Sequence, residues 1–304
     1  MDAFTDSGEL YSIRNEFYTN QHNRVKNYLL DSFSAENQLK VLEFQIRSTI
    51  ALGEDASQLI SSGKSRFPDN DGFFQLLEAY NDLSSFGTDS STYFDDVKEA
   101  SFELEAVLTA LYLVKYEKDF EQATKILNGY IAKGTPEFEP YLLLVQLHLV
   151  QIDLVAANKT FNELKKFNMS DDIVYSVIES WINALRGESE NINNSFYFYD
   201  ELLSTDFEDD NQSKFRILNV LFVLTLQLQH YPEATELLSQ IESIHPEVTG
   251  DFVANQIAYD YLVNFGSNVP DLLTKLRQVQ EGHRRLTDLE EKSKLFDDIA
   301  VKYA

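Results

Sequence analysis

The sequence contains no cysteine and few basic residues. Without cysteine the chain forms no disulfide bond and offers no thiolate as ligand or nucleophile. Small secreted scaffolds usually need such cross-links, so we expect a reducing, cytosolic setting. Only 25 Lys and Arg residues stand against 50 Asp and Glu residues, which gives a formal charge of −25. That charge repels phosphate backbones and anionic head groups, and it argues against nucleic acid and direct membrane insertion.

Long apolar runs are also missing. The best candidate, residues 217–228, is interrupted by Asn219, Thr225 and Gln227. The first residues, MDAFTDSGELYS, are acidic where a secretory signal would be basic and then apolar. We therefore expect neither a membrane span nor a secretory signal in this chain.

Alternating apolar runs joined by hairpin turns, the pattern of β-strands, do not occur with any strength. Apolar residues instead recur at helical spacing along the chain, and hydrophobic residues make up 43% of it, which is ample for a core. The sequence therefore predicts an all-α fold. We expect residues 1–304 to form a single domain, with residues 1–8 flexible and residues 284–304 forming a polar C-terminal capping helix.

Two helical hairpins follow each other at a fixed spacing between Phe102 and Lys166. The runs KDFEQATKIL and IDLVAANKTF place a small residue, Ala123 and Ala157, at the same point of a second helix, 34 residues apart. This is the period of the tetratricopeptide repeat, a pair of antiparallel helices. One pair cannot bury its apolar faces alone, so neighbouring pairs must stack. The pattern predicts a tetratricopeptide-like α-solenoid that offers a binding surface rather than a reaction centre.

Beyond Met169 the period becomes longer. Ser195 is the expected small residue of the next repeat, 38 residues after Ala157, which indicates about four residues inserted in the preceding turn. Ala234 then restores the pattern. The segments 84–91 and 206–214, rich in Ser, Gly, Thr and acidic residues, are predicted to be loops.

Signals for chemistry are weak. Gly63, Lys64 and Ser65 resemble the end of a phosphate-binding loop, but Gln58 stands where that motif requires glycine, and no strand precedes it. The five histidines are scattered, without a second ligand at helical spacing. We therefore predict no enzyme activity and no catalytic, metal-binding or cofactor-binding residues.

In tetratricopeptide folds the leading helices line the concave surface, which binds partners. At the two central repeats the outward positions of these helices are predicted to be Leu108, Tyr112, Lys115, Leu142, Gln146 and Leu149. Apolar side chains at such positions favour an amphipathic or extended partner segment in the groove. Contact with the chain's own termini is an equally good interpretation of the same residues.

A second function remains open, that of a co-chaperone adaptor which captures a C-terminal peptide. Its carboxylate clamp needs Lys, Arg and Asn on consecutive leading helices. Glu105 and Glu139 lie at positions related to Lys115 and weaken this interpretation, whereas Arg216 and Asn219 favour it.

Several segments resemble the epsilon subunit of coatomer. The resemblance begins with ELYSIRNEFYTNQ and continues in order through LVAANKTFNELKKFNMSDD, ESWINALRGESENINNSFYFYDELL, IHPEV and HRRLTDLEEKSKLFDDIAVKYA. It spans nearly the whole chain, with a weakly matching region at residues 35–94.

This resemblance implies a non-catalytic subunit of the COPI vesicle coat, without a cofactor. It implies that the solenoid binds and stabilises the C-terminal region of the alpha subunit, as a heterodimer within the coat. It also implies retrograde Golgi-to-ER and intra-Golgi transport, on Golgi membranes and COPI-coated vesicles, with recruitment through the rest of coatomer and a small GTPase.

Overall fold

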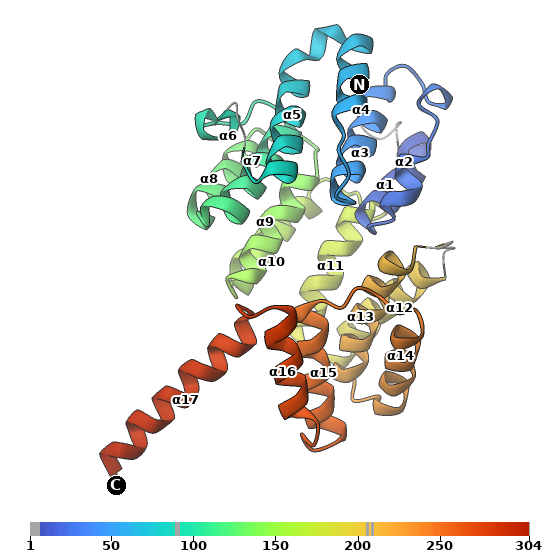
Figure 1. Cartoon of the computed structure of the whole chain (residues 1–304). Helices are drawn as coiled ribbons and strands as arrows, with labels where there is room; N and C mark the ends of the chain where they lie inside the picture. The colour runs from blue at the N-terminus through green and yellow to red at the C-terminus, as the bar shows by residue number, and fades with distance from the viewer. Residues whose placement is uncertain (1–6, 89–91, 205–206, 208–209, 304) are drawn as a thin grey trace. The chain divides into compact units, whose positions relative to one another are not determined.

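The computed structural model describes residues 7–88, 92–204, 207 and 210–303, and throughout these ranges the chain forms helices and turns without a strand (Figure 1). The predicted all-α fold is confirmed. The flexible start predicted for residues 1–8 falls largely outside the described residues, since Ser7 already begins the first helix. No helix in the described ranges is long and apolar enough to cross a membrane.

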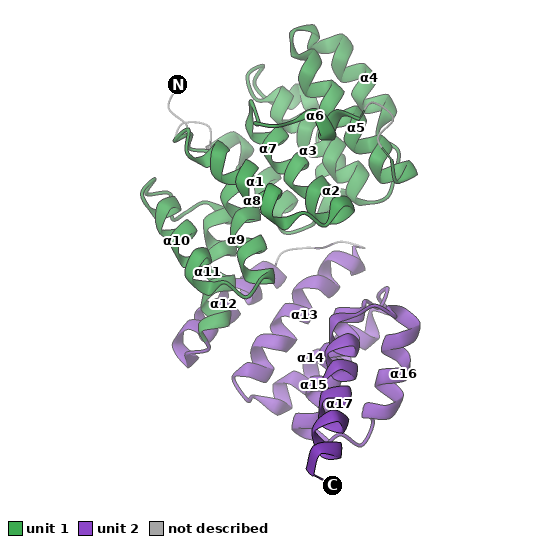
Figure 2. Cartoon of the chain, turned by 90° about the vertical axis from the view of Figure 1, so that its left-hand side faces the viewer, with its two compact units in different colours: residues 1–186 green, residues 187–304 purple. Residues whose placement is uncertain are grey.

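The chain divides into two compact units, Met1–Arg186 and Gly187–Ala304, which have different colours in Figure 2. Each unit is built from antiparallel helix pairs, and the prediction of one continuous domain stays a prediction. The helices of unit 1 are α1 (Ser7–Tyr18), α2 (His22–Lys26), α3 (Gln38–Ala51), α4 (Ser57–Arg66), α5 (Asp71–Phe86), α6 (Tyr93–Asp96), α7 (Glu103–Tyr112), α8 (Phe120–Ile131), α9 (Glu139–Val150), α10 (Leu154–Lys165) and α11 (Ile173–Arg186). Short 3₁₀ turns cover Leu30–Ser32 and Pro68–Asn70, and a π-helical turn, Leu113–Glu117, extends α7.

The leading helices of unit 1 form a closed circuit. Helix α1 contacts α3, and the contacts continue through α5, α7 and α9 to α11. Helix α11 also contacts α1, so the first and last leading helices of the unit meet. The solenoid of unit 1 therefore curls until its first and last leading helices touch.

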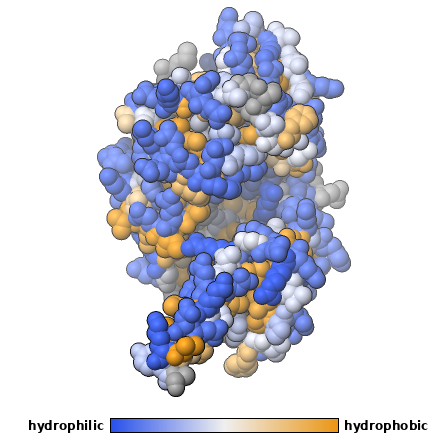
Figure 3. Space-filling model, turned by 60° about the vertical axis from the view of Figure 1, so that its left-hand side comes forward, coloured by the Kyte–Doolittle hydropathy of each residue, from blue (hydrophilic) through white to orange (hydrophobic). Residues whose placement is uncertain are grey.

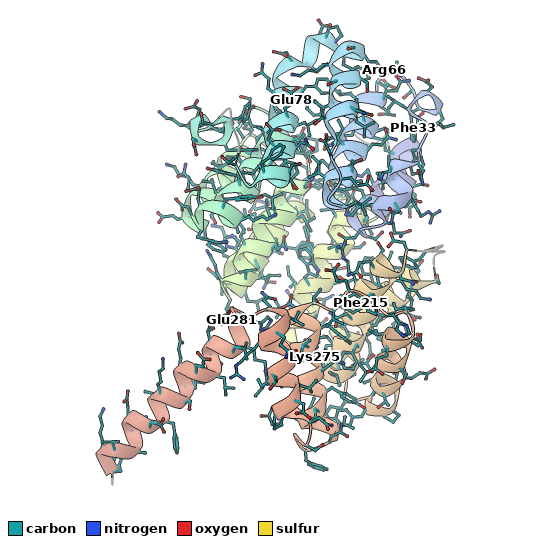
Figure 4. All side chains as sticks on the ribbon, in the orientation of Figure 1. Phe33, Arg66, Glu78, Phe215, Lys275 and Glu281 are labelled. Carbon is teal, nitrogen blue, oxygen red and sulfur yellow. The ribbon has the colours of Figure 1, made fainter. Side chains whose placement is uncertain are left out.

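Unit 2 continues the pairing with α12 (Ser189–Leu203), α13 (Asn211–Gln227), α14 (Tyr231–Ser243), α15 (Gly250–Val263), α16 (Val269–Val279) and α17 (Arg284–Tyr303). Phe215 of α13 lies among the side chains of this unit in Figure 4, and its ring meets that of Phe252 edge to face at 5.3 Å. Of α17, only Leu286 is buried, against the core of α15 and α16. The predicted capping role of residues 284–304 stays a prediction.

The turn between the two helices of a pair has one repeated geometry. The residue before the helix cap has a positive φ, as at Lys118 (59°) and Ile152 (63°). Four residues beyond the cap, the amide of Ala123 donates to the Asp119 carbonyl at 3.2 Å, and Ala157 donates to Asp153 at 3.1 Å. The two central hairpins therefore share their turn as well as their period.

The next hairpin corrects the predicted position of its small residue. Gly187 is the turn residue, with φ 74°, and the amide of Ile192 donates to the Glu188 carbonyl at 3.0 Å. The equivalent of Ala157 is thus Ile192, and the prediction of Ser195 was wrong. Ser195 is also buried, but it lies one turn later in α12. The spacing of small residues does not indicate this position, because a large aliphatic side chain, that of Ile192, occupies it.

The predicted acidic loop at residues 206–214 is shorter than expected. Helix α13 begins at Asn211, because the Asp210 carboxylate accepts a hydrogen bond from the Ser213 amide at 3.0 Å and caps the helix. Asp206, Glu208 and Asp209 lie outside the described residues. The predicted loop at residues 84–91 begins later than expected, since α5 continues to Phe86 and ends at Gly87, with φ 74°.

Gly63, the glycine of the phosphate-loop-like sequence, lies inside α4 and serves packing. A Cβ atom at this position would lie 2.5 Å from the Phe74 ring and 2.7 Å from a methyl group of Leu42. Side chains of α3 and α5 therefore lie closer to the backbone of α4 at Gly63 than a side chain at this position would allow.

We predict that Gly63→Ala destabilises the protein by about 1–3 kcal/mol, because the added methyl group must displace buried side chains. Gly129→Ala is the matched control, since this helical glycine has open space at its Cβ position. The control should stabilise by about 0.5–1 kcal/mol through helix propensity. Urea denaturation followed by circular dichroism measures both, and equal stability of the two variants would contradict the packing role.

Candidate partner-binding face

Two of the residues predicted to face a groove on α7 are covered by the chain itself. Leu108 is 0% exposed and belongs to the core between α5 and α7, so its prediction as an outward residue was wrong. Tyr112 is half-buried, with its ring stacked on Phe94 at 5.0 Å and its hydroxyl donating to Asp95 at 2.8 Å. The short helix α6, for which the 34-residue pattern has no place, covers this side of α7.

The other four predicted residues remain accessible. Lys115 is exposed on the π-helical turn after α7. On α9, Leu142 and Leu149 are half-buried and Gln146 is exposed, and their spacing places them on one face of the helix. We call Leu142, Gln146 and Leu149 the strip on α9. Contact of these residues and of Lys115 with a partner stays a prediction.

A buried charge network holds the inner side of unit 1, and the sequence did not predict it. Arg47 of α3 binds Glu139 of α9 with both of its terminal nitrogens, one of them at 2.8 Å. The same guanidinium donates to Glu43 at 3.0 Å, and Lys40 lies 3.0 Å from both Glu43 and Glu103 of α7. We call Lys40, Glu43, Arg47, Glu103 and Glu139 the inner charge network.

Electrostatics keep the Arg47–Glu139 pair ionised. Burial opposes the charge on Glu139, but the attraction and hydrogen bonds of Arg47 outweigh it and hold the pKa of Glu139 below its ordinary value of 4.5. Burial lowers the pKa of Arg47, but the attraction and hydrogen bonds of Glu139 outweigh this effect. The pKa of Arg47 is therefore raised well above its ordinary value. A fully paired, bidentate arrangement is the geometry in which a buried ion pair offsets its desolvation.

A second contact closes the ends of the circuit. Arg14 of α1 donates to Asp172, directly before α11, at 2.6 Å, although 158 residues separate them. Tyr18, one turn further along α1, donates to Glu139 at 3.2 Å and so connects this closure with the inner charge network. A cavity of about 540 Å³ lies on the same seam, lined among others by Tyr11, Asn15, Met169 and Asp171.

Two residues weighed for the alternative carboxylate clamp make contacts inside their own units. Glu139 is committed to Arg47, and Asn219 accepts a hydrogen bond from Asn255 at 3.1 Å within unit 2. In the described part of the chain, no group of three or more His, Asp or Glu side chains is placed to hold a metal ion.

The fold is a scaffold of the α-solenoid class. Its helical hairpins are stacked and share one turn geometry, buried ion pairs join its leading helices, and some of its helices carry accessible strips of side chains. The family model described as "Coatomer epsilon subunit" matches residues 6–304. The chain therefore belongs to the coatomer epsilon subunit family, a component of the COPI vesicle coat, and the resemblance seen in the sequence is confirmed.

A curated relative agrees with this assignment. The chain is similar to the "Probable coatomer subunit epsilon" of Schizosaccharomyces pombe (strain 972 / ATCC 24843), with 27% identity over 202 residues. The matched region covers 66% of this chain and 64% of the relative, so it spans just under two thirds of the relative's length.

We predict that Glu139→Gln destabilises the protein by about 3–5 kcal/mol at neutral pH, because Arg47 then remains buried beside a neutral amide. The pKa of Glu139 is lower in the folded protein than in the unfolded chain, so ionised Glu139 stabilises the wild type above about pH 4.5. This stabilisation is lost as the pH falls through the pKa that Glu139 has in the folded protein. The difference between wild type and variant should therefore shrink below pH 4.5 in urea denaturation.

Glu163→Gln is the control for this experiment. Glu163 pairs with Lys166 at the surface, where such pairs contribute at most about 1 kcal/mol. A loss at Glu139 no larger than the loss at Glu163 would contradict a structural role of the inner charge network.

Proposed function

We propose that this chain is a non-catalytic structural subunit of the COPI coat that binds and stabilises the C-terminal region of the alpha subunit. The two chains form a heterodimer within the coat and support retrograde Golgi-to-ER and intra-Golgi transport. The protein is cytoplasmic and reaches Golgi membranes and COPI-coated vesicles through the other coat subunits. The match of the epsilon family to residues 6–304 is the observation that carries this proposal.

The structure of unit 1 suits a scaffold. Its interior is held by the inner charge network and by the contact between α1 and α11, so little ordering is needed when a partner arrives. A preorganised surface keeps more of its interaction free energy as affinity, because fewer side chains and loops lose freedom on binding. Rigidity of this kind supports a stabilising role toward another subunit.

The accessible strip on α9 supplies the contact in this proposal. Leu142 and Leu149 provide half-buried apolar anchors, and Gln146 between them offers a hydrogen-bonding group. A central apolar pair with a polar neighbour is the usual composition of an interface core and its rim. The formal charge of −25 adds a preference for a partner with basic residues around that core.

Co-expression with the C-terminal region of the alpha subunit tests the proposal. We expect both chains in one gel-filtration peak, at the mass of the complex. Two separate peaks would contradict the proposed pairing, provided that circular dichroism shows the epsilon-family chain to be folded.

We further predict that Leu149→Glu weakens this complex by roughly 2 kcal/mol or more, since a charge replaces an apolar anchor. Val155→Glu on α10 is the matched control, because Val155 is 83% exposed and lies outside the strip. The control should stay within about 0.5 kcal/mol of wild type in titration calorimetry. If both variants bind like wild type, the strip on α9 is the wrong face.

A further inference from the structure

Helix α17 leaves nearly all of its apolar surface without a partner. It is 20 residues long, and beyond Leu286 every described side chain of the helix is exposed. Figure 4 labels Glu281, just before the helix, and shows the side chains of α17 standing clear of the other helices of unit 2. Phe296 and Tyr303 are 71% and 88% exposed, and hydrophobic atoms lie between hydrophilic ones on this helix in Figure 3.

Five apolar residues of α17, together with Ser293, follow the spacing of a helix-packing seam, whereas Leu295, Ile299 and Val301 lie off it. Leu286, Leu289, Ser293, Phe296, Ala300 and Tyr303 are separated by alternating steps of three and four residues. This spacing keeps one stripe facing a neighbouring helix, with each large residue inserted between residues of the partner. In this seam the large residues alternate with two small ones, so a partner helix has room for bulky side chains over Ser293 and Ala300.

The two flanks of the seam differ in charge. On one flank lie Glu290 and Asp297, one heptad apart, and no basic residue within the described chain forms an ion pair with either. On the other flank Lys292 is already paired with Asp288. The unbalanced charge beside the seam is therefore negative, which favours a partner with Lys or Arg along the facing flank.

A second copy of this chain fits the seam poorly. In a parallel pair, Ser293 and Ala300 would meet their own copies and leave gaps in the packing. In an antiparallel pair, Glu290 and Asp297 would face the same carboxylates. Each chain also carries a formal charge of −25, which opposes self-association.

We propose that α17 is a docking site for an amphipathic helix of another subunit of the coat. That helix places bulky aliphatic side chains over Ser293 and Ala300 and basic side chains beside Glu290 and Asp297. The contact is separate from the strip on α9. This proposal rests on the proposed function, because the partner helix is sought in the assembled coat complex.

Photo-crosslinking in the assembled coat complex tests this docking site. A photoreactive amino acid replaces Phe296 in the full chain, and in a second preparation it replaces Val301, which is 79% exposed on the opposite side of the helix. We expect position 296 to crosslink at least tenfold more strongly than position 301. Its product should be a helical segment of another subunit with the described pattern. A crosslink inside this chain, to a second copy, or no excess over position 301 would overturn the proposal.

A substitution pair makes the test independent of the probe. Ala300→Glu fills the space reserved for the partner, whereas Val301→Glu adds the same charge away from the seam; both residues are exposed in the free chain. We expect Ala300→Glu to lower the crosslinking yield from position 296 at least tenfold and Val301→Glu to leave it within twofold. Equal yields would contradict the seam.

The two proposals fail in different ways. If the chain does not pair with the alpha-subunit region, the proposed function fails whatever α17 does. If the chain enters the coat normally but position 296 gives no partner crosslink, only the docking site on α17 fails.

Discussion

The ion pair between Arg47 and Glu139 is the interaction on which unit 1 depends. It joins α3 and α9, whose paired residues are 92 positions apart, and both side chains are buried. A buried charge is tolerated only when its partner is held in place, so the pair requires the leading helices to keep their positions. Glu43, Lys40 and Glu103 extend this requirement to α7. The curl of the unit is therefore fixed by electrostatics as well as by apolar stacking.

This closure determines which surfaces are left for other proteins. Because α1 meets α11 and the inner charge network joins α3, α7 and α9, these leading helices use part of their surface for contacts with one another. Leu108 and Tyr112 are covered by neighbouring helices of unit 1 and not by the termini of the chain. The accessible apolar groups of the described chain include those of the strip on α9 and, in unit 2, those along α17. Interactions of a coat subunit are best sought on these two strips.

The sequence predicted the repeat well where local chemistry defines it. Ala123, Ala157 and Ala234 occupy equivalent buried positions, and helix pairing follows from their spacing. The predicted repeat position was wrong in α12, where a large residue, Ile192, occupies the position that a small residue holds in the other repeats. The prediction for Leu108 was wrong because this side chain packs into the core that α7 shares with α3, α4 and α5. The inner charge network could not be predicted, since Arg47 and Glu139 become neighbours only after the helices between α3 and α9 have packed.

The closure of unit 1 is the central claim, and the distance between α1 and α11 tests it most directly. The chain has no cysteine, so spin labels can be placed at two positions alone, Tyr11→Cys on α1 and Asp171→Cys before α11. These residues line the same cavity. Pulsed electron resonance at neutral pH should give one short, narrow distance distribution. A broad distribution at long distance would contradict a closed circuit of leading helices.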